Sequence, residues 1–159
     1  MNAPTPNRPT RTPHLRLVVE PTEARQRAWF ARVDRELRSF LARHGHALSD
    51  PSLAHWVIEE CAELAWTARP DQPGWDALRV AASWHRLSHL HRFFPQPRLV
   101  VAFYETLRAF LPWLMQHGRL ERGACLAMLQ QLELVRSPLL EQARAQLERR
   151  YAGTSHGRA

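Results

Sequence analysis

Residues 49–70, SDPSLAHWVIEECAELAWTARP, contain a helix together with its start and stop signals. Asp50 is suited to cap the first turn, and Pro51 suits the first helical position because its ring already holds a helical φ angle. Apolar residues then recur every three or four positions, which places them on one face of a helix. They are Leu53, Val57, Cys61, Leu64 and Ala68. Since Pro70 cannot continue the helix, this stretch predicts one amphipathic helix with both ends marked.

The same spacing of apolar residues continues on both sides of this stretch. It predicts further helices over residues 22–44, 75–93, 98–117, 120–135 and 138–151. No segment alternates between apolar and polar residues for long enough to predict a strand. We therefore expect an all-α fold, a compact single-domain bundle of five to six amphipathic helices with disordered termini.

The last two of these helices depend on a repeated start signal. Ser137 and Pro138 again place a capping residue before a proline, which predicts a break and a new helix. Leucines are expected to face inward on both sides of that break. They are Leu126, Leu129, Leu132, Leu140 and Leu147.

The bundle is expected to occupy residues 21–151. A disordered arm rich in proline and arginine is expected at residues 1–20, and a disordered tail at residues 152–159. Within the arm, residues 15–19, LRLVV, form a short apolar patch directly before Pro21. Such a patch suits two roles, because it can dock on the body as an extended segment or bind a partner as a short linear motif.

The composition limits the function classes that fit this chain. Its 159 residues carry 22 basic and 15 acidic side chains, for a formal net charge of +7, and every basic residue is arginine. An absence of lysine is typical of a very GC-rich genome, so abundant arginine indicates nucleic acid less strongly than usual. The length fits one domain and excludes a (β/α)₈ barrel. A hydrophobic content of 45% excludes a wholly disordered chain.

The cysteines and the apolar runs indicate the compartment. Cys61 and Cys125 form no C-x-x-C motif, so reduced and buried thiols are expected. The first residues lack the apolar run of a secretory signal, and no run approaches the length of about 18 residues that a membrane span needs. We expect a cytoplasmic protein with no membrane contact.

Sequence motifs for catalysis and for cofactors do not occur. The six glycines do not cluster, so no phosphate-binding loop is predicted. Neither a G-x-S-x-G elbow nor an H-E-x-x-H motif occurs, and E-x-x-H does not repeat on two helices. We therefore expect no enzyme and no cofactor.

Two histidines give the densest group of possible ligands. His85 and His89 are four residues apart, so both rings can reach one point beside a helix, where Cys61, Glu60 or His55 would be a third metal ligand. Histidines on an apolar stripe more often pack against neighbours, so we assign no metal. For Glu60, the sequence predicts a structural ion pair with an arginine from a neighbouring helix.

Two hypotheses for function remain. The first is a non-enzymatic interaction or regulatory module that binds a protein partner through its arm and a helical face, with homo-oligomers as one form. The alternative is a DNA-binding accessory protein that uses its basic ends and a helix-turn-helix, formed either by the helices over residues 98–117 and 120–135 or by the last two helices. The candidate contact residues are Arg8, Arg11, Arg16, Gln142, Gln146, Arg149 and Arg150. Trp56 and Trp66 lie off the main apolar stripe and either pack against other helices or mark a partner surface.

One segment resembles a known domain. Residues 103–120 look like part of the helical core-binding domain of tyrosine recombinases. However, the run from His85 to His89 precedes this segment, whereas the catalytic box of that family follows it, and Ser88 stands where the box has arginine. The resemblance is mostly that of amphipathic spacing, so we assign the chain to no family.

Overall fold

The computed structural model describes residues 21–90 and 97–154. Within these ranges the chain is all α-helical and contains no strand, as the sequence predicts. Five α-helices are α1 (Thr22–His44), α2 (Pro51–Ala68), α3 (Val80–Leu90), α4 (Pro97–Gln116) and α5 (Arg122–Thr154). Two short 3₁₀ helices, η1 (Gly45–Ala47) and η2 (Trp75–Ala77), follow α1 and precede α3. The predicted disorder of residues 1–20 and 155–159 falls outside the described residues.

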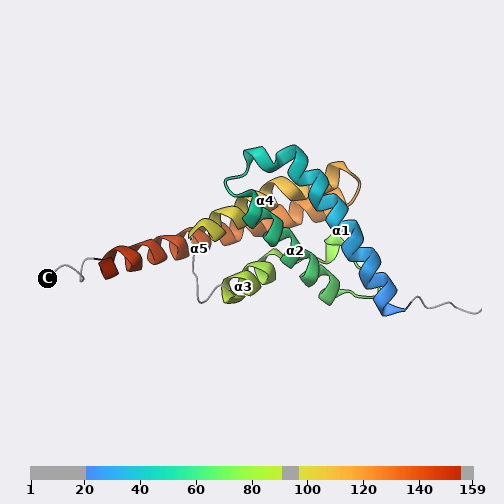
Figure 1. The fold of residues 1–159 in the computed structure, drawn as a ribbon, viewed down its shortest axis with the longest axis horizontal. Helices are drawn as coiled ribbons and strands as arrows, with labels where there is room; N and C mark the ends of the chain where they lie inside the picture. Colours follow the sequence, from blue (N-terminus) through green and yellow to red (C-terminus); the bar gives the residue numbers. More distant parts are fainter. Residues whose placement is uncertain (1–20, 91–96, 155–159) are drawn as a thin grey trace, which may run out of the picture.

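The helices are arranged around α4 (Figure 1). α4 and α5 run antiparallel and make the most extensive contact between elements. α2 packs on α4, α1 packs on α2, and α3 contacts both α2 and α5. With 33 residues, α5 is about 50 Å long, whereas α4 with 20 residues is about 30 Å long. The C-terminal half of α5 therefore projects beyond the other helices (Figure 1).

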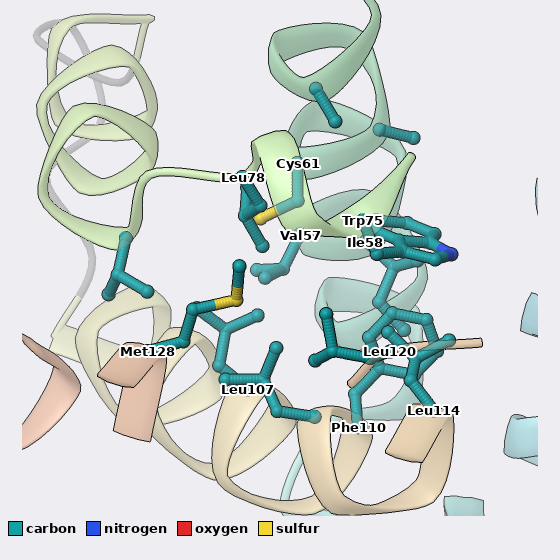
Figure 2. Packing of buried hydrophobic residues seen from close by; sticks show 14 of the residues in the cluster. Val57, Ile58, Cys61, Trp75, Leu78, Leu107, Phe110, Leu114, Leu120 and Met128 are labelled. Carbon is teal, nitrogen blue, oxygen red and sulfur yellow. The ribbon is translucent and has the colours of Figure 1, made fainter. Parts of the chain in front are cut away.

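The core joins all five α-helices and η2, and part of it is shown in Figure 2. Trp75 lies in this core, with its ring 5.3 Å from Trp29 and 5.1 Å from Phe110. Its indole nitrogen donates a hydrogen bond of 2.7 Å to the buried carboxylate of Glu36, and Arg119 lies 3.4 Å from the other oxygen of that group. The single buried carboxylate of α1 thereby connects η2 to the α4–α5 turn.

Local sequence signals explain several helix ends. The Asp50 carboxylate accepts a hydrogen bond of 3.1 Å from the amide of Leu53, which confirms the predicted cap of α2. α4 ends at Gln116, and Gly118 after it has a φ of +65°, a conformation that residues with a Cβ rarely adopt.

The prediction of one helix over residues 75–93 was wrong. The chain forms η2, becomes extended at Leu78 and starts α3 only at Val80. Trp75 and Leu78 are both buried, so this irregular stretch directs two large side chains into the core. Residues 91–93 lie outside the described residues.

The predicted break at Ser137 and Pro138 was also wrong, since α5 continues through both residues to Thr154. A proline inside a helix leaves the carbonyl four residues earlier without a donor, here that of Leu134. Leu134 is 79% exposed, so water can satisfy this carbonyl. The helix also includes residues 152–154, which the sequence analysis assigns to the tail.

Candidate partner-binding surface

Exposed apolar side chains gather on two helices. Among the described residues, the large hydrophobic side chains with substantial exposure all belong to α4 and α5. They are Val101 (40% exposed), Leu126 (51%), Leu134 (79%) and Leu140 (53%). Since single exposed leucines are common, the useful observation is their concentration on one helix pair.

A groove runs between α4 and α5 within this surface. It has a volume of about 290 Å³, and its lining joins Val100, Val101, Tyr104, Glu105 and Arg108 of α4 to Arg136 and Leu140 of α5. We refer to it as the α4–α5 groove. Two of its apolar residues, Val101 and Leu140, are among the most exposed hydrophobic residues of the molecule. The groove is thus an apolar surface that the described part of the chain leaves uncovered.

Tyr104 is held in a fixed position in this groove. Its hydroxyl donates a hydrogen bond of 2.5 Å to Glu133 of α5. The guanidinium carbons of Arg108 and Arg136 lie 5.8 Å and 5.5 Å from its ring centre, within the range of a cation–π interaction. These contacts bring two positive charges to the margin of an apolar groove.

The carboxylates near the groove already have hydrogen-bonding or ion-pair partners within the chain. Glu105 accepts hydrogen bonds from the amide and the hydroxyl of Ser49, at 3.1 Å and 2.9 Å, and Arg136 lies 3.7 Å from Glu133. Among the described residues, no carboxylate lies within ion-pair distance of Arg108. The exposed guanidinium of Arg108 is therefore available to an acidic group from outside the chain.

Several predicted features fall elsewhere in the fold. The rings of His85 and His89 stack with their centres 6.3 Å apart. Over residues 21–90 and 97–154, no three His, Cys, Asp or Glu side chains gather as a metal site would require. Glu60 accepts a hydrogen bond of 3.0 Å from Arg86 of α3, which confirms the predicted ion pair.

The residues proposed for DNA contact are not brought together in the described structure. Arg8, Arg11 and Arg16 lie outside the described residues, and so do the side chains of Gln142, Gln146, Arg149 and Arg150 on α5. The helix-turn-helix expected from the last two helices does not exist, because α5 is continuous where the turn was expected. DNA binding by the basic ends stays a prediction.

The sequence analysis predicted the wrong orientation for two leucines of α5. Leu126 and Leu140 were expected to face inward, yet both are more than half exposed. Residues six apart differ by about 120° around a helix, so Leu126 cannot share the face of the fully buried Leu132.

The sequence analysis missed Tyr104, Arg108 and Arg136, because their contacts join α4 to α5 and no local motif marks such a pairing.

The thiols and the remaining tryptophans behave as structural groups. Cys61 and Cys125 are both free and buried, as expected. Burial raises the pKa of the Cys61 thiol from its ordinary value of 9.0 to about 12, although a hydrogen bond with Ser83 acts in the opposite direction. Trp66 is buried and Trp56 packs against the core, which favours the packing interpretation of both.

The comparisons with known proteins give no relative. No protein-family model matches the chain, and neither the curated proteins nor the solved structures contain a match. Within the part of the chain that is described, none of the helices combines the length and the apolar character that crossing a bilayer requires. The function must therefore be argued from the surface itself.

Proposed function

We propose that this protein is a non-enzymatic interaction module that binds a helical segment of a partner protein in the α4–α5 groove. The observation that carries this proposal is the concentration of exposed apolar side chains on α4 and α5, around a groove that contains Val101 and Leu140. An amphipathic helix laid into a groove between two helices buries such side chains at a spacing of one helical turn.

The charges at the margin define the partner further. The guanidinium groups of Arg108 and Arg136 lie near the ring of Tyr104 at the edge of the groove. Among the described residues, Arg108 has no carboxylate partner. A partner helix with apolar residues on one face and acidic residues beside them matches this arrangement. Because the margin is exposed to solvent, the charges should affect specificity and association rate more than the final affinity.

Two synthetic helical peptides test this proposal. Both carry leucines at positions i, i+3, i+4 and i+7, and the residues flanking these leucines are glutamates in one peptide and lysines in the other. We expect saturable binding of the glutamate peptide by fluorescence anisotropy, about tenfold tighter than that of the lysine peptide at low salt. The substitution Arg108→Glu should reverse this preference, because it changes the sign of the free charge.

A matched pair of variants locates the binding site. Leu140→Asp introduces a charge into the groove and should abolish peptide binding, whereas Leu126→Asp on an exposed side of α5 outside the groove lining should leave it unchanged. Circular dichroism shows whether both variants keep the fold. Equal binding of the two peptides, or equal loss in the two variants, would contradict the proposal. Occupation by a second copy would appear as a dimer in sedimentation.

A further inference from the structure

A second groove lies between α1 and α2. Its volume of about 500 Å³ is within the range of sites that hold small molecules. Phe30, Val33 and Leu37 of α1 and Trp56 of α2 give it apolar walls, and four carboxylates complete its lining: Asp34, Glu59, Glu60 and Glu63. We refer to it as the α1–α2 groove. It combines aromatic and aliphatic walls with negative charge, whereas the α4–α5 groove has arginines at its margin.

The four carboxylates of the α1–α2 groove are not equivalent. Three of them have cationic partners within the chain: Asp34 pairs with Arg38 at 2.5 Å, Glu59 with His55 at 3.1 Å, and Glu60 with Arg86 at 3.0 Å. The fourth residue, Glu63, is half-buried, and no cation of the described residues pairs with its carboxylate. Glu63 is therefore available to a cation from outside the described part of the chain.

The free carboxylate and the tryptophan of the groove lie at opposite ends of it. α1 and α2 run in opposite directions (Figure 1), and the rings of Phe30 and Trp66 lie 6.4 Å apart. Because Glu63 precedes Trp66 by about one turn of α2, Phe30 lies at the Glu63 end of the groove. Trp56 lies about two turns earlier on α2, about 10 Å away along the helix axis. A ligand that contacts both ends must therefore be elongated.

We propose that the α1–α2 groove binds a small organic amine, with its ammonium group paired to Glu63 and its apolar body along the walls toward Trp56. This site is separate from partner binding in the α4–α5 groove. An ammonium group can donate a charge-assisted hydrogen bond to a single carboxylate, and the aromatic walls attract a cation through their π-electrons. The apolar body adds to the affinity because its burial removes apolar surface of both molecules from water.

The lining of the groove also excludes two other kinds of ion. Across residues 21–90 and 97–154, no three His, Cys, Asp or Glu side chains gather as a metal ion requires. An anion with the same apolar body would meet four carboxylates, which repel it, so the groove distinguishes an amine from a carboxylic acid of equal length.

Three probes that share parts of one structure test the proposal. Octylamine has an ammonium group and a long alkyl chain, octanol has the same chain without the charge, and ethylamine has the charge with a very short chain. In an NMR titration, octylamine should shift the indole N–H signal of Trp56 saturably and bind about fivefold tighter than octanol, as expected for one partly exposed ion pair. Ethylamine should leave the signal unchanged at the same concentrations. The signal of Trp113, which is buried outside the groove lining, should not move.

A matched pair of charge reversals locates the ammonium group. Glu63→Lys should weaken octylamine binding and make the groove prefer octanoate, because it reverses the charge at the proposed ion pair. Glu121→Lys makes the same change of net charge at an exposed carboxylate outside the groove, and it should keep the preference for octylamine. Circular dichroism shows whether both variants keep the fold.

Three results would overturn the proposal. The first is that octylamine and octanol bind equally tightly. The second is that octylamine shifts the Trp113 signal as much as that of Trp56, since binding would then not be confined to this groove. The third is that Glu63→Lys and Glu121→Lys have the same preference between octylamine and octanoate.

Discussion

α2 and α5 differ in where their buried residues lie along the helix. α2 has 18 residues, and seven of them are buried, spread from Ala54 to Trp66. α5 has 33 residues, but the buried residues described on it are confined to its start: Cys125, Met128 and Leu132. α2 therefore contributes buried side chains to the core along its length. The described buried side chains of α5 lie only near its start, and leucines further along this helix are exposed to solvent. This difference indicates that substitutions on α2 should change stability and those on the outer side of α5 should change binding.

The largest expected effect is on α2. Ile58 is completely buried, so Ile58→Ala removes apolar contacts and leaves a cavity that the core can only partly fill. We expect the free energy of unfolding to fall by about 2–5 kcal/mol, as for other large-to-small substitutions in cores. Urea denaturation followed by circular dichroism measures the change. A fall below about 1 kcal/mol would show that α2 does not hold the core as described.

The thiol of Cys61 on α2 should make stability depend on alkaline pH. The folded pKa is about 12, while the ordinary value is 9.0, so the unfolded chain loses this proton first as the pH rises. The stabilisation is complete below pH 9.0 and is lost between about 9 and 12, with a loss of about 1 kcal/mol at pH 10. Because the chain has no lysine, few other groups titrate in this window.

A cysteine variant separates this effect from other alkaline changes. Denaturation curves at pH 8 and pH 10 should differ less for Cys61→Ala than for the unsubstituted protein. Burial also raises the pKa of Cys125 on α5, so Cys125→Ala is the matched comparison. An unchanged pH dependence in Cys61→Ala would assign the alkaline loss to other groups.

The smallest expected effect is on α5. Leu134 is 79% exposed, so Leu134→Ala removes few contacts and should change the free energy of unfolding by less than about 0.5 kcal/mol. The same substitution at Leu132, two residues earlier and fully buried, is the control that should be strongly destabilising. Thermal unfolding of the two variants compares the two sides of one helix. Similar melting temperatures would contradict the burial that distinguishes them.

The sequence predicted those parts of the fold that local chemistry determines. Asp50 and Pro51 start α2 as expected, because both the cap and the first turn depend on neighbouring residues alone. The same signal failed at Ser137 and Pro138, where the exposure of Leu134 lets the helix continue. The solvent exposure of a residue depends on how the neighbouring helices pack, so it cannot be predicted from a local sequence pattern.

The candidate site was less predictable than the fold. The ion pair of Glu60 with an arginine was expected, because a carboxylate beside an apolar face needs a partner in a packed bundle. Tyr104 and Glu133 are separated by 29 residues, and their hydrogen bond depends on how α4 and α5 are aligned. Such an alignment is fixed by packing over the whole helix pair, so the α4–α5 groove could be found only in the structure.

The buried carboxylate of Glu36 has a consequence for how the chain folds. Its two partners, Trp75 and Arg119, come from segments that follow it at increasing distance along the chain. A partly folded state that contained only α1, α2 and η2 would hold the carboxylate of Glu36 beside Trp75 without the cationic partner Arg119, which is unfavourable. We therefore expect the first helices to remain unstable until the α4–α5 turn arrives, so that folding is a single cooperative transition without a populated N-terminal intermediate.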